Sequence, residues 1–453
     1  MKPHTEPRRR SLKRRAARVA AVLGLIGVVC AAIAILLEDS ILNSYARRRI
    51  EKAFAAAHLG QVLRIGPMDN SWRTGRLAAD SVLLTTPHTT LKSGPVVIRK
   101  VRWAPLLRRK LALPEVFAQA SLEATNLAFE FSKPRYVLRC ARLEASVPAA
   151  TLSARSISLG PQAGDEAFFA ASQFRNTRLR LAIPECRVAG VSFTELLGGT
   201  ASRAQSLQVS GLELEALVNR EKPKDPVMRP GVMVHEALAR LGQEIALDLL
   251  TLTNGTVKYC ERLAASGPPG VLTFGAVQLS AKGLANRGPP GTAMSIQAQG
   301  NLMNAGTLKV AMSLPVVSPD FSLSYTGSLS AMDITRLDAF LEIAERIRIT
   351  SGRAESVAFD IQVKAGRATG SVQPIYRDLD IAFLDPKTGS EKGVLNRTES
   401  FLANTFKIRS ANLPDSSGAV RAGEVKYERK PDDTFLQFIW FALRSGVLDS
   451  IHL

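Results

Sequence analysis

The sequence lacks the short motifs that mark the common kinds of enzyme active site. It contains no G-x-S-x-G, no P-loop and no G-x-G-x-x-G, and no pair of carboxylates in a setting typical of tuned acid–base catalysis. The five histidines are scattered, and "HEALA" at 235–239 lacks the second histidine of a zincin site. These absences predict a protein that is not an enzyme, with no catalytic residues, cofactor or metal site. A hydrolase assembled from distant residues is the alternative.

Cysteine and aromatic residues are also scarce. Four cysteines stand far apart without a C-x-x-C pair, namely Cys30 in an apolar run and Cys140, Cys186 and Cys260 beyond it. The last three allow one disulfide at most, and buried free thiols are the simpler interpretation. Aromatic residues make up 6% of the chain, so most of its apolar surface must come from leucine, valine, isoleucine and alanine.

Acidic residues are too few to balance the basic ones. Lys and Arg number 59 against 40 Asp and Glu, and the formal net charge is +19. The excess is spread along the chain and suits an anionic surface, either lipid headgroups or nucleic acid. No base-stacking motif accompanies the basic cluster at Arg108, Arg109 and Lys110. We therefore predict that this cluster contacts headgroups or is a solvated face, and that nucleic acid is not a partner.

An uncharged apolar run follows the basic tail at 1–18. "VAAVLGLIGVVCAAIAILL", residues 19–37, is long enough as a helix to cross a bilayer, at about 1.5 Å per residue. We predict a retained transmembrane anchor, with the tail in the cytoplasm and the rest on the far side. A cleaved signal peptide, a lipoprotein site and twin-arginine export are the alternatives. The helical pattern after the anchor places Arg47, Arg48 and Arg49 near the headgroups or against the first strands.

Most of the remaining chain has apolar residues at alternate positions, which predicts strands with one apolar face. In "ALDLLTLTNGTVKYC", residues 246–260, Asn254-Gly255 predicts a hairpin in which Leu252 faces Val257. Alternating strands most often bury their apolar face in a sandwich core, so this face has two interpretations. It packs inside the protein, or it holds an apolar ligand.

Other segments predict how the chain is divided. The segment 219–231 is rich in proline and charge and predicts a linker between two β parts. Helices are predicted at 232–241 and from an N-cap at Asp333. The last segment, 434–453, is apolar on nearly all sides as a helix and predicts either a plug, a membrane contact or packing against the last strands.

Several segments in sequence order resemble the AsmA-like family of Gram-negative envelope proteins. They include "LRIGPMDNSWRTGRLAADSVLL", "IRKVRWAPLLRRKLALPEVFAQASLEATNLAFEF", "YTGSLSAMDITRLDAFLEIAERIRIT" and "EVKYERKPDDTFLQFIWFALRSGVL". The resemblance implies a mainly β fold. In it a long twisted antiparallel sheet curves into a half-open hydrophobic groove, with a few short helices and the N-terminal transmembrane helix. It also implies a periplasmic groove made of an N-terminal part at 38–218 and an AsmA-like C-terminal part at 232–433.

The function implied by this resemblance is to hold or transport phospholipid along the groove for outer-membrane biogenesis, from an inner-membrane anchor. The predicted partners are phospholipids, the inner membrane and other envelope proteins. A scaffold for outer-membrane proteins with a solid core and no lipid is the alternative. The predicted groove lining consists of Leu247, Leu250, Leu252, Val257, Tyr259, Leu127, Phe129, Phe131, Val357, Phe359, Ile361 and Val363.

Overall fold

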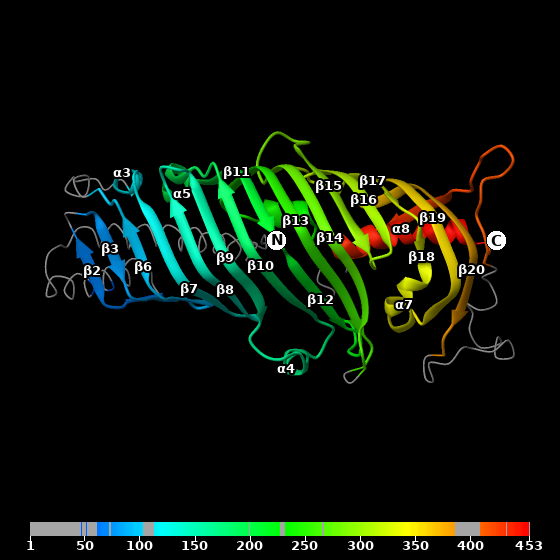
Figure 1. Ribbon diagram of the computed structural model, residues 1–453, viewed down its shortest axis with the longest axis horizontal. Coiled ribbons are helices and arrows are strands. Elements are labelled where there is room, and N and C mark those ends of the chain that lie inside the picture. The colour runs from blue at the N-terminus through cyan, green and yellow to red at the C-terminus, as the bar shows by residue number, and fades with distance from the viewer. Residues whose placement is uncertain are drawn as a thin grey trace, which may run out of the picture.

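The computed structural model describes residues 47, 51, 61–71, 74–102, 113–198, 200–226, 232–264, 267–385, 408–431 and 433–452. In this part the chain is mainly β, as predicted, and its strands form one large mixed sheet accompanied by a few short helices (Figure 1). The predicted anchor at 19–37 lies outside the described residues, as do Arg48, Arg49, Arg108, Arg109 and Lys110. None of the described helices is long and apolar enough to span a bilayer.

The sheet contains 21 strands in the described part of the chain. The first twelve are β1 (Val62–Ile65), β2 (Met68–Ser71), β3 (Arg76–Ala79), β4 (Val82–Thr85), β5 (Thr89–Ser93), β6 (Val96–Arg99), β7 (Ser121–Ser132), β8 (Arg135–Ser146), β9 (Thr151–Pro161), β10 (Thr177–Ala189), β11 (Ala201–Ser210) and β12 (Glu213–Asn219). The other nine are β13 (Glu244–Arg262), β14 (Gly270–Ala285), β15 (Ala293–Leu302), β16 (Gly306–Pro315), β17 (Leu323–Leu329), β18 (Met332–Asp333), β19 (Ile347–Lys364), β20 (Arg367–Phe383) and β21 (Gly423–Glu428).

The described helices are α3 (Leu113–Phe117), α4 (Asp165–Ala170), α5 (Phe193–Gly198), α6 (Val234–Ala239), the 3-10 helix η2 (Ile334–Leu337), α7 (Asp338–Ala344) and α8 (Phe435–Ile451). Three predicted helices are therefore confirmed. α6 lies inside the predicted 232–241, and α8 occupies most of 434–453. The third begins after Asp333, whose carboxylate accepts a hydrogen bond from the Thr335 N–H at 3.0 Å. It starts as η2 and continues as α7.

Most neighbours in the sheet are also neighbours in sequence and run antiparallel. At the N-terminal end β7 pairs with both β5 and β6, so the sheet divides into the branches β5–β4–β1 and β6–β3–β2. β11 and β12 lie end to end, because both pair with β10 on one side and with β13 on the other. Their pairings with β13 are parallel, which corrects the all-antiparallel sheet expected from the sequence. The long connection that contains α6 carries the chain back along the sheet. β13 therefore begins beside the start of β11, as a parallel pairing requires. Strand pairing therefore continues from β12 to β13, on either side of the predicted linker.

The prediction of a hairpin at Asn254-Gly255 is wrong. β13 runs through both residues as one strand of 19 residues. Asn254 has a φ of 54°, and the register against β14 shifts on both sides of Gly255. The dipeptide therefore forms a β-bulge, in which Asn254 alone has the left-handed backbone that the predicted turn requires at both residues. Leu252 and Val257 lie along one strand and do not face each other.

This bulge belongs to a series that crosses the sheet. Residues with positive φ also occur at Asn126 in β7, Ser156 in β9, Gly211 between β11 and β12, and Ala276 in β14. We call this line of irregular residues the crease. At the crease the apolar alternation shifts by one position in each strand from β7 to β14. An extra residue in a strand offsets such a shift, so the apolar side chains stay on one face of the sheet.

The strand register assembles the apolar side chains into continuous rows. The first row runs through Leu77, Ile98, Leu122, Ala145, Leu152, Val188, Leu207, Leu250, Ala281, Ile296, Met312, Tyr325, Ile361, Gly370 and Val425. The second runs through Ala124, Leu143, Ala154, Cys186, Val209, Leu252, Leu279, Ala298, Val310, Gly327, Phe359 and Val372. A third, beyond the crease, runs through Leu91, Phe129, Leu138, Leu159, Leu181, Leu214, Val257, Phe274 and Leu302.

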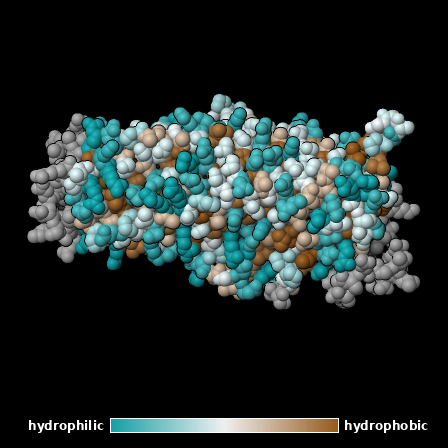
Figure 2. Space-filling model, in the orientation of Figure 1, coloured by the Kyte–Doolittle hydropathy of each residue, from teal (hydrophilic) through white to brown (hydrophobic). Residues whose placement is uncertain are grey.

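The residues between the first two rows point to the opposite face and are mostly polar. They are Glu144, Ser153, Arg187, Gln208, Thr251, Ser280, Gln297, Ala311, Thr326, Asp360, Ser371 and Glu424. Ion pairs join neighbouring strands on this polar face, for example Arg142 with Glu123 at 3.0 Å and Arg155 with Glu185 at 3.8 Å. Figure 2 shows one side of the molecule, where hydrophilic residues alternate with smaller hydrophobic areas along its length. The sheet is thus amphipathic from one end to the other.

Candidate apolar binding surface

The apolar rows are buried at both ends of the sheet. At the N-terminal end Leu77, Leu91 and Ile98 belong to a closed core that includes Val116 and Phe117 at α3. At the C-terminal end Tyr325, Ile361 and Val425 share a larger core with Phe438 and Ala442 of α8. These ends are therefore filled by the protein itself.

The middle of the rows is different, because its side chains are only partly buried. We call this part the central apolar surface. It consists of Leu138, Leu143, Ala145, Leu152, Leu159, Leu181, Cys186, Val188, Leu207, Val209, Leu214, Leu250 and Val257, from β8 to β13. The nearby Leu179 is 41% exposed. In the described part of the chain, the small core on these strands is built from β6 to β9 of the same sheet, without a second layer.

The predicted lining residues of β13 fall mostly within these rows. Val257 is a half-buried member of the central apolar surface. Leu250 is half-buried where this surface meets the large C-terminal core, against which it packs, and Leu252 is a buried neighbour in the second row. Leu247 is half-buried near the start of β13. Tyr259 is covered, since its ring lies 5.8 Å from that of Phe340 in α7.

The predicted lining residues of β7 and β19 have less access to solvent. In β7, Leu127 is buried, whereas Phe129 and Phe131 are half-buried. In β19, Val357 is half-buried at the edge of the large C-terminal core. Phe359, Ile361 and Val363 are buried in that core together with residues of α8. These three side chains are therefore part of a packed interior and do not line an exposed surface, which corrects the prediction for them.

Helix α8 seals the C-terminal part of the apolar face by close packing. A Cβ on Gly446 would lie 2.6 Å from Val372, so only glycine allows the helix to approach β20 this closely. The Tyr325 hydroxyl donates a hydrogen bond to the carbonyl of Ile439 at 3.2 Å. Of the three roles predicted for this segment, packing against the last strands is the one observed. The sequence did not indicate which face would pack, because α8 is apolar on most sides.

The central apolar surface carries no group suited to chemistry. Its one thiol, Cys186, has a pKa raised by burial, which lowers the reactive thiolate fraction. Cys140, Cys186 and Cys260 are free thiols, as the simpler interpretation predicted. No group of three or more potential metal ligands occurs among the described residues. Of the predicted basic residues, only Arg47 is described, as part of a helix. What this surface offers a ligand is aliphatic contact.

Two buried arginines on the opposite face were missed by sequence reasoning. Arg178 pairs with Asp165 at 3.0 Å and with Glu215 at 2.5 Å, and the guanidinium of Arg262 lies 4.4 Å from the ring centroid of Phe169. Both arginines connect α4 to the polar face of the sheet through these contacts. No local motif marks them, because their partners are distant in sequence. They stabilise the sheet and do not form a ligand site.

Comparison with known proteins adds no family assignment. Neither a scan against protein-family models nor a search of curated proteins finds a match to this chain.

Proposed function

We propose that this chain is an inner-membrane-anchored periplasmic protein, similar to the AsmA-like family, which holds or transports phospholipid along an apolar groove. The observation that supports the proposal best is the central apolar surface. Its aliphatic side chains lie in register across β8 to β13 and are only partly buried. An extended apolar surface of this kind marks a binding site more often than a stable solvated face.

The physical reason for such a surface is the cost of moving acyl chains through water. An acyl chain loses about 0.8 kcal/mol for each methylene exposed to water. A two-chain lipid therefore needs a continuous apolar path, and rows that cross several strands would supply one. The headgroup would remain in solvent. Leucine, valine and alanine contacts are non-directional, so a chain could slide along the rows without breaking specific hydrogen bonds.

The proposed path is confined to the middle of the sheet. The N-terminal core and the large C-terminal core fill the apolar face at the two ends, and the second core includes residues of β14 to β16, so acyl contacts are expected from about β8 to β13. α8 would then act as an end wall. In this proposal the protein has no catalytic role, and outer-membrane lipid supply is the process that it serves.

A photo-crosslinking experiment with matched positions tests the proposal. A photoreactive amino acid is introduced in the full-length protein in cells at Leu250 on the apolar face, at Thr251 on the polar face, or at Phe359 in the closed core. Phospholipid adducts are expected at Leu250 only, measured by mass spectrometry of the purified protein. Equal lipid labelling at Leu250 and Thr251, or none at either, would refute lipid binding on this surface.

The scaffold for outer-membrane proteins remains the second candidate. The large closed core under α8 favours it, because a solid C-terminal end is what a protein-binding scaffold would have. The same experiment separates the two functions. Polypeptide adducts at Leu250 without lipid adducts would support the scaffold and exclude lipid cargo.

A further inference from the structure

Helix α8 carries an apolar stripe on a side that does not pack against the sheet. Leu436 is 73% exposed and Trp440 is 46% exposed, and Leu443 and Val447 continue the stripe as half-buried residues. Side chains three or four positions apart lie on one side of a helix, so the four form a continuous strip. Exposed apolar side chains are ordinary when they are scattered singly, whereas a contiguous group marks a contact. We call these four residues the α8 stripe.

The contacts of α8 determine the direction in which this stripe points. The side chains of Ser445 and Asp449 accept hydrogen bonds from backbone N–H groups of β21, at the C-terminal edge of the sheet. On another side of the helix, the carbonyl of Ile439 accepts a hydrogen bond from Tyr325 in β17. At about 100° per residue, the α8 stripe follows next around the helix, beyond Ile439. The stripe is therefore turned away from the β21 edge and toward the strands that precede β17.

The N-terminal half of α8, which holds Leu436 and Trp440, is the inner end of the helix. Figure 1 shows α8 extending from the marked C-terminus toward the middle of the sheet. Leu443 of the α8 stripe and Leu250 of β13 both pack against the large C-terminal core. The α8 stripe and the central apolar surface are therefore bordered by the same core.

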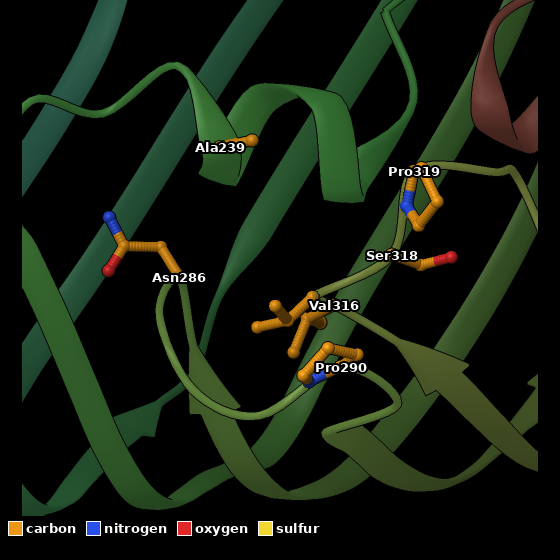
Figure 3. Close-up of a pocket in the computed structure, with 7 residues that line it drawn as sticks. Ala239, Asn286, Pro290, Val316, Ser318 and Pro319 are labelled. Atoms are coloured by element: carbon orange, nitrogen blue, oxygen red, sulfur yellow. The ribbon is translucent and has the colours of Figure 1, made fainter.

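Two recesses at the ends of the strands do not continue the apolar rows. A polar cleft of about 320 Å³ is lined by residues of four segments, among them His235 and Arg429. An apolar crevice of about 210 Å³ adjoins it at Pro319, and Figure 3 shows Ala239 of α6 on one side of the crevice with Val316 opposite. No member of the three rows lines either recess. An acyl chain that follows the rows toward the C-terminal end therefore meets α8 and not a pocket.

The α8 stripe offers aliphatic and indole contact without charge. Between positions 434 and 448, Arg444 is the one charged residue, and it pairs with Glu345 at 3.7 Å. The indole of Trp440 makes no hydrogen bond or ring contact with any residue that the structure describes. A protein partner usually brings charged groups and hydrogen bonds to an interface, whereas an acyl chain needs neither. These features favour an acyl chain as the occupant.

We propose that the α8 stripe is a second wall of the phospholipid path, and that Leu436 and Trp440 contact an acyl chain whose other part lies on the central apolar surface. The inference rests on the function proposed above. A sheet covers an acyl chain on one side only. A wall beside the sheet covers a second side, so more methylenes leave water where the path ends. α8 thus binds the chain in addition to closing the C-terminal core.

Photo-crosslinking at matched leucines tests this contact. A photoreactive amino acid is introduced in the full-length protein at Leu436, or at Leu413, which is 50% exposed on the segment before β21. Leu250 reports on the central apolar surface. Each protein is irradiated in cells, and again after purification in detergent with its retained lipid. Phospholipid adducts are expected at Leu436 and Leu250 under both conditions and not at Leu413, as measured by mass spectrometry.

Each other outcome has a distinct meaning. Lipid adducts at Leu250 without adducts at Leu436 would overturn the second wall and leave the proposed function standing, as would equal lipid labelling at Leu436 and Leu413. Adducts at Leu436 in cells only would identify a bilayer contact, and polypeptide adducts there would identify a protein partner. Either result would overturn the proposal. Absence of lipid adducts at Leu250 would instead refute the proposed function.

The amount of retained lipid provides an independent test. Leu436→Asp should reduce the phospholipid retained per protein about tenfold, because apolar contact equivalent to about two methylenes is lost. Leu413→Asp, the matched control, should leave retention unchanged. Both side chains are exposed, so far-ultraviolet circular dichroism should show an unchanged fold in both variants. Equal retention by the two variants would contradict an acyl contact at α8.

Discussion

A truncation at Leu250, compared with one at Ile361, measures directly whether the middle of the sheet is open. Both side chains belong to the first apolar row, but Ile361 is 0% exposed beneath α8, whereas Leu250 is half-buried. Ile361→Ala removes the transfer free energy of a buried side chain and leaves a cavity, which together cost about 2–5 kcal/mol. Leu250→Ala loses only about half of a full leucine transfer, or about 1 kcal/mol, because solvent fills the space.

The assay is chemical denaturation of the delipidated full-length protein, followed by far-ultraviolet circular dichroism. Thr251→Ala, next to Leu250 and on the polar face, controls for the loss of a side chain in the same strand. The expected order of destabilisation is Ile361→Ala, then Leu250→Ala, then Thr251→Ala. A cost at Leu250 equal to that at Ile361 would mean that a second layer covers the surface, and the proposed path for acyl chains would be refuted.

Three further predictions concern the parts that close the sheet. Phe438→Ala should cost about 3–5 kcal/mol, since Phe438 is fully buried, whereas Leu436→Ala, 73% exposed on the same helix, should change denaturation by less than about 0.5 kcal/mol. Gly446→Val should destabilise the protein by about 1–3 kcal/mol or more, because even a Cβ at this position would overlap β20. Limited proteolysis of this variant should then release α8. Burial lowers the pKa of His235 below its ordinary 6.5, so the unfolded chain takes up the proton more readily. Stability should therefore decrease as the pH falls below about 6.5, with no such change above it, and His235→Phe should reduce this dependence in denaturation curves at pH 7.5 and 5.5.

The alternation of apolar residues predicted the β character of the chain, because a period of two places every second side chain on one face. The lining residues chosen from that pattern in β13 and β7, such as Leu250 and Phe129, do lie in the apolar rows. The apolar alternation also changes phase within β7 near Asn126. It could not show that the same shift recurs at one line across neighbouring strands, since register is a property of pairing and not of one strand.

The errors have a common physical origin. Asn254 adopts a left-handed backbone, which both a bulge and a hairpin turn use, whereas Gly255 does not adopt the second left-handed conformation of the turn, and only the neighbouring strands decide between the two. Similarly, Phe359 and Ile361 have the same local pattern as Leu250. What covers them is α8, which comes about 80 residues later in the chain and docks through glycine. The polar cleft lined by His235, Asp320, Gly366 and Arg429 left no signal either, because its residues come from four distant segments.

The two ends of the sheet show how its edge N–H groups are occupied beside a partly buried apolar middle. Unpaired edge N–H groups are templates for aggregation, and an exposed apolar face beside them would increase that hazard. At β21 these groups are occupied, because the N–H of Glu424 donates to the Asp449 carboxylate at 2.8 Å and that of Lys426 to the Ser445 hydroxyl at 3.2 Å, both on α8. At β1 the N–H of Ile65 donates to the Glu51 carboxylate at 2.7 Å. The helix that fills the C-terminal core thus also closes the edge. This double role accounts for a sealed C-terminal end next to the partly buried central apolar surface.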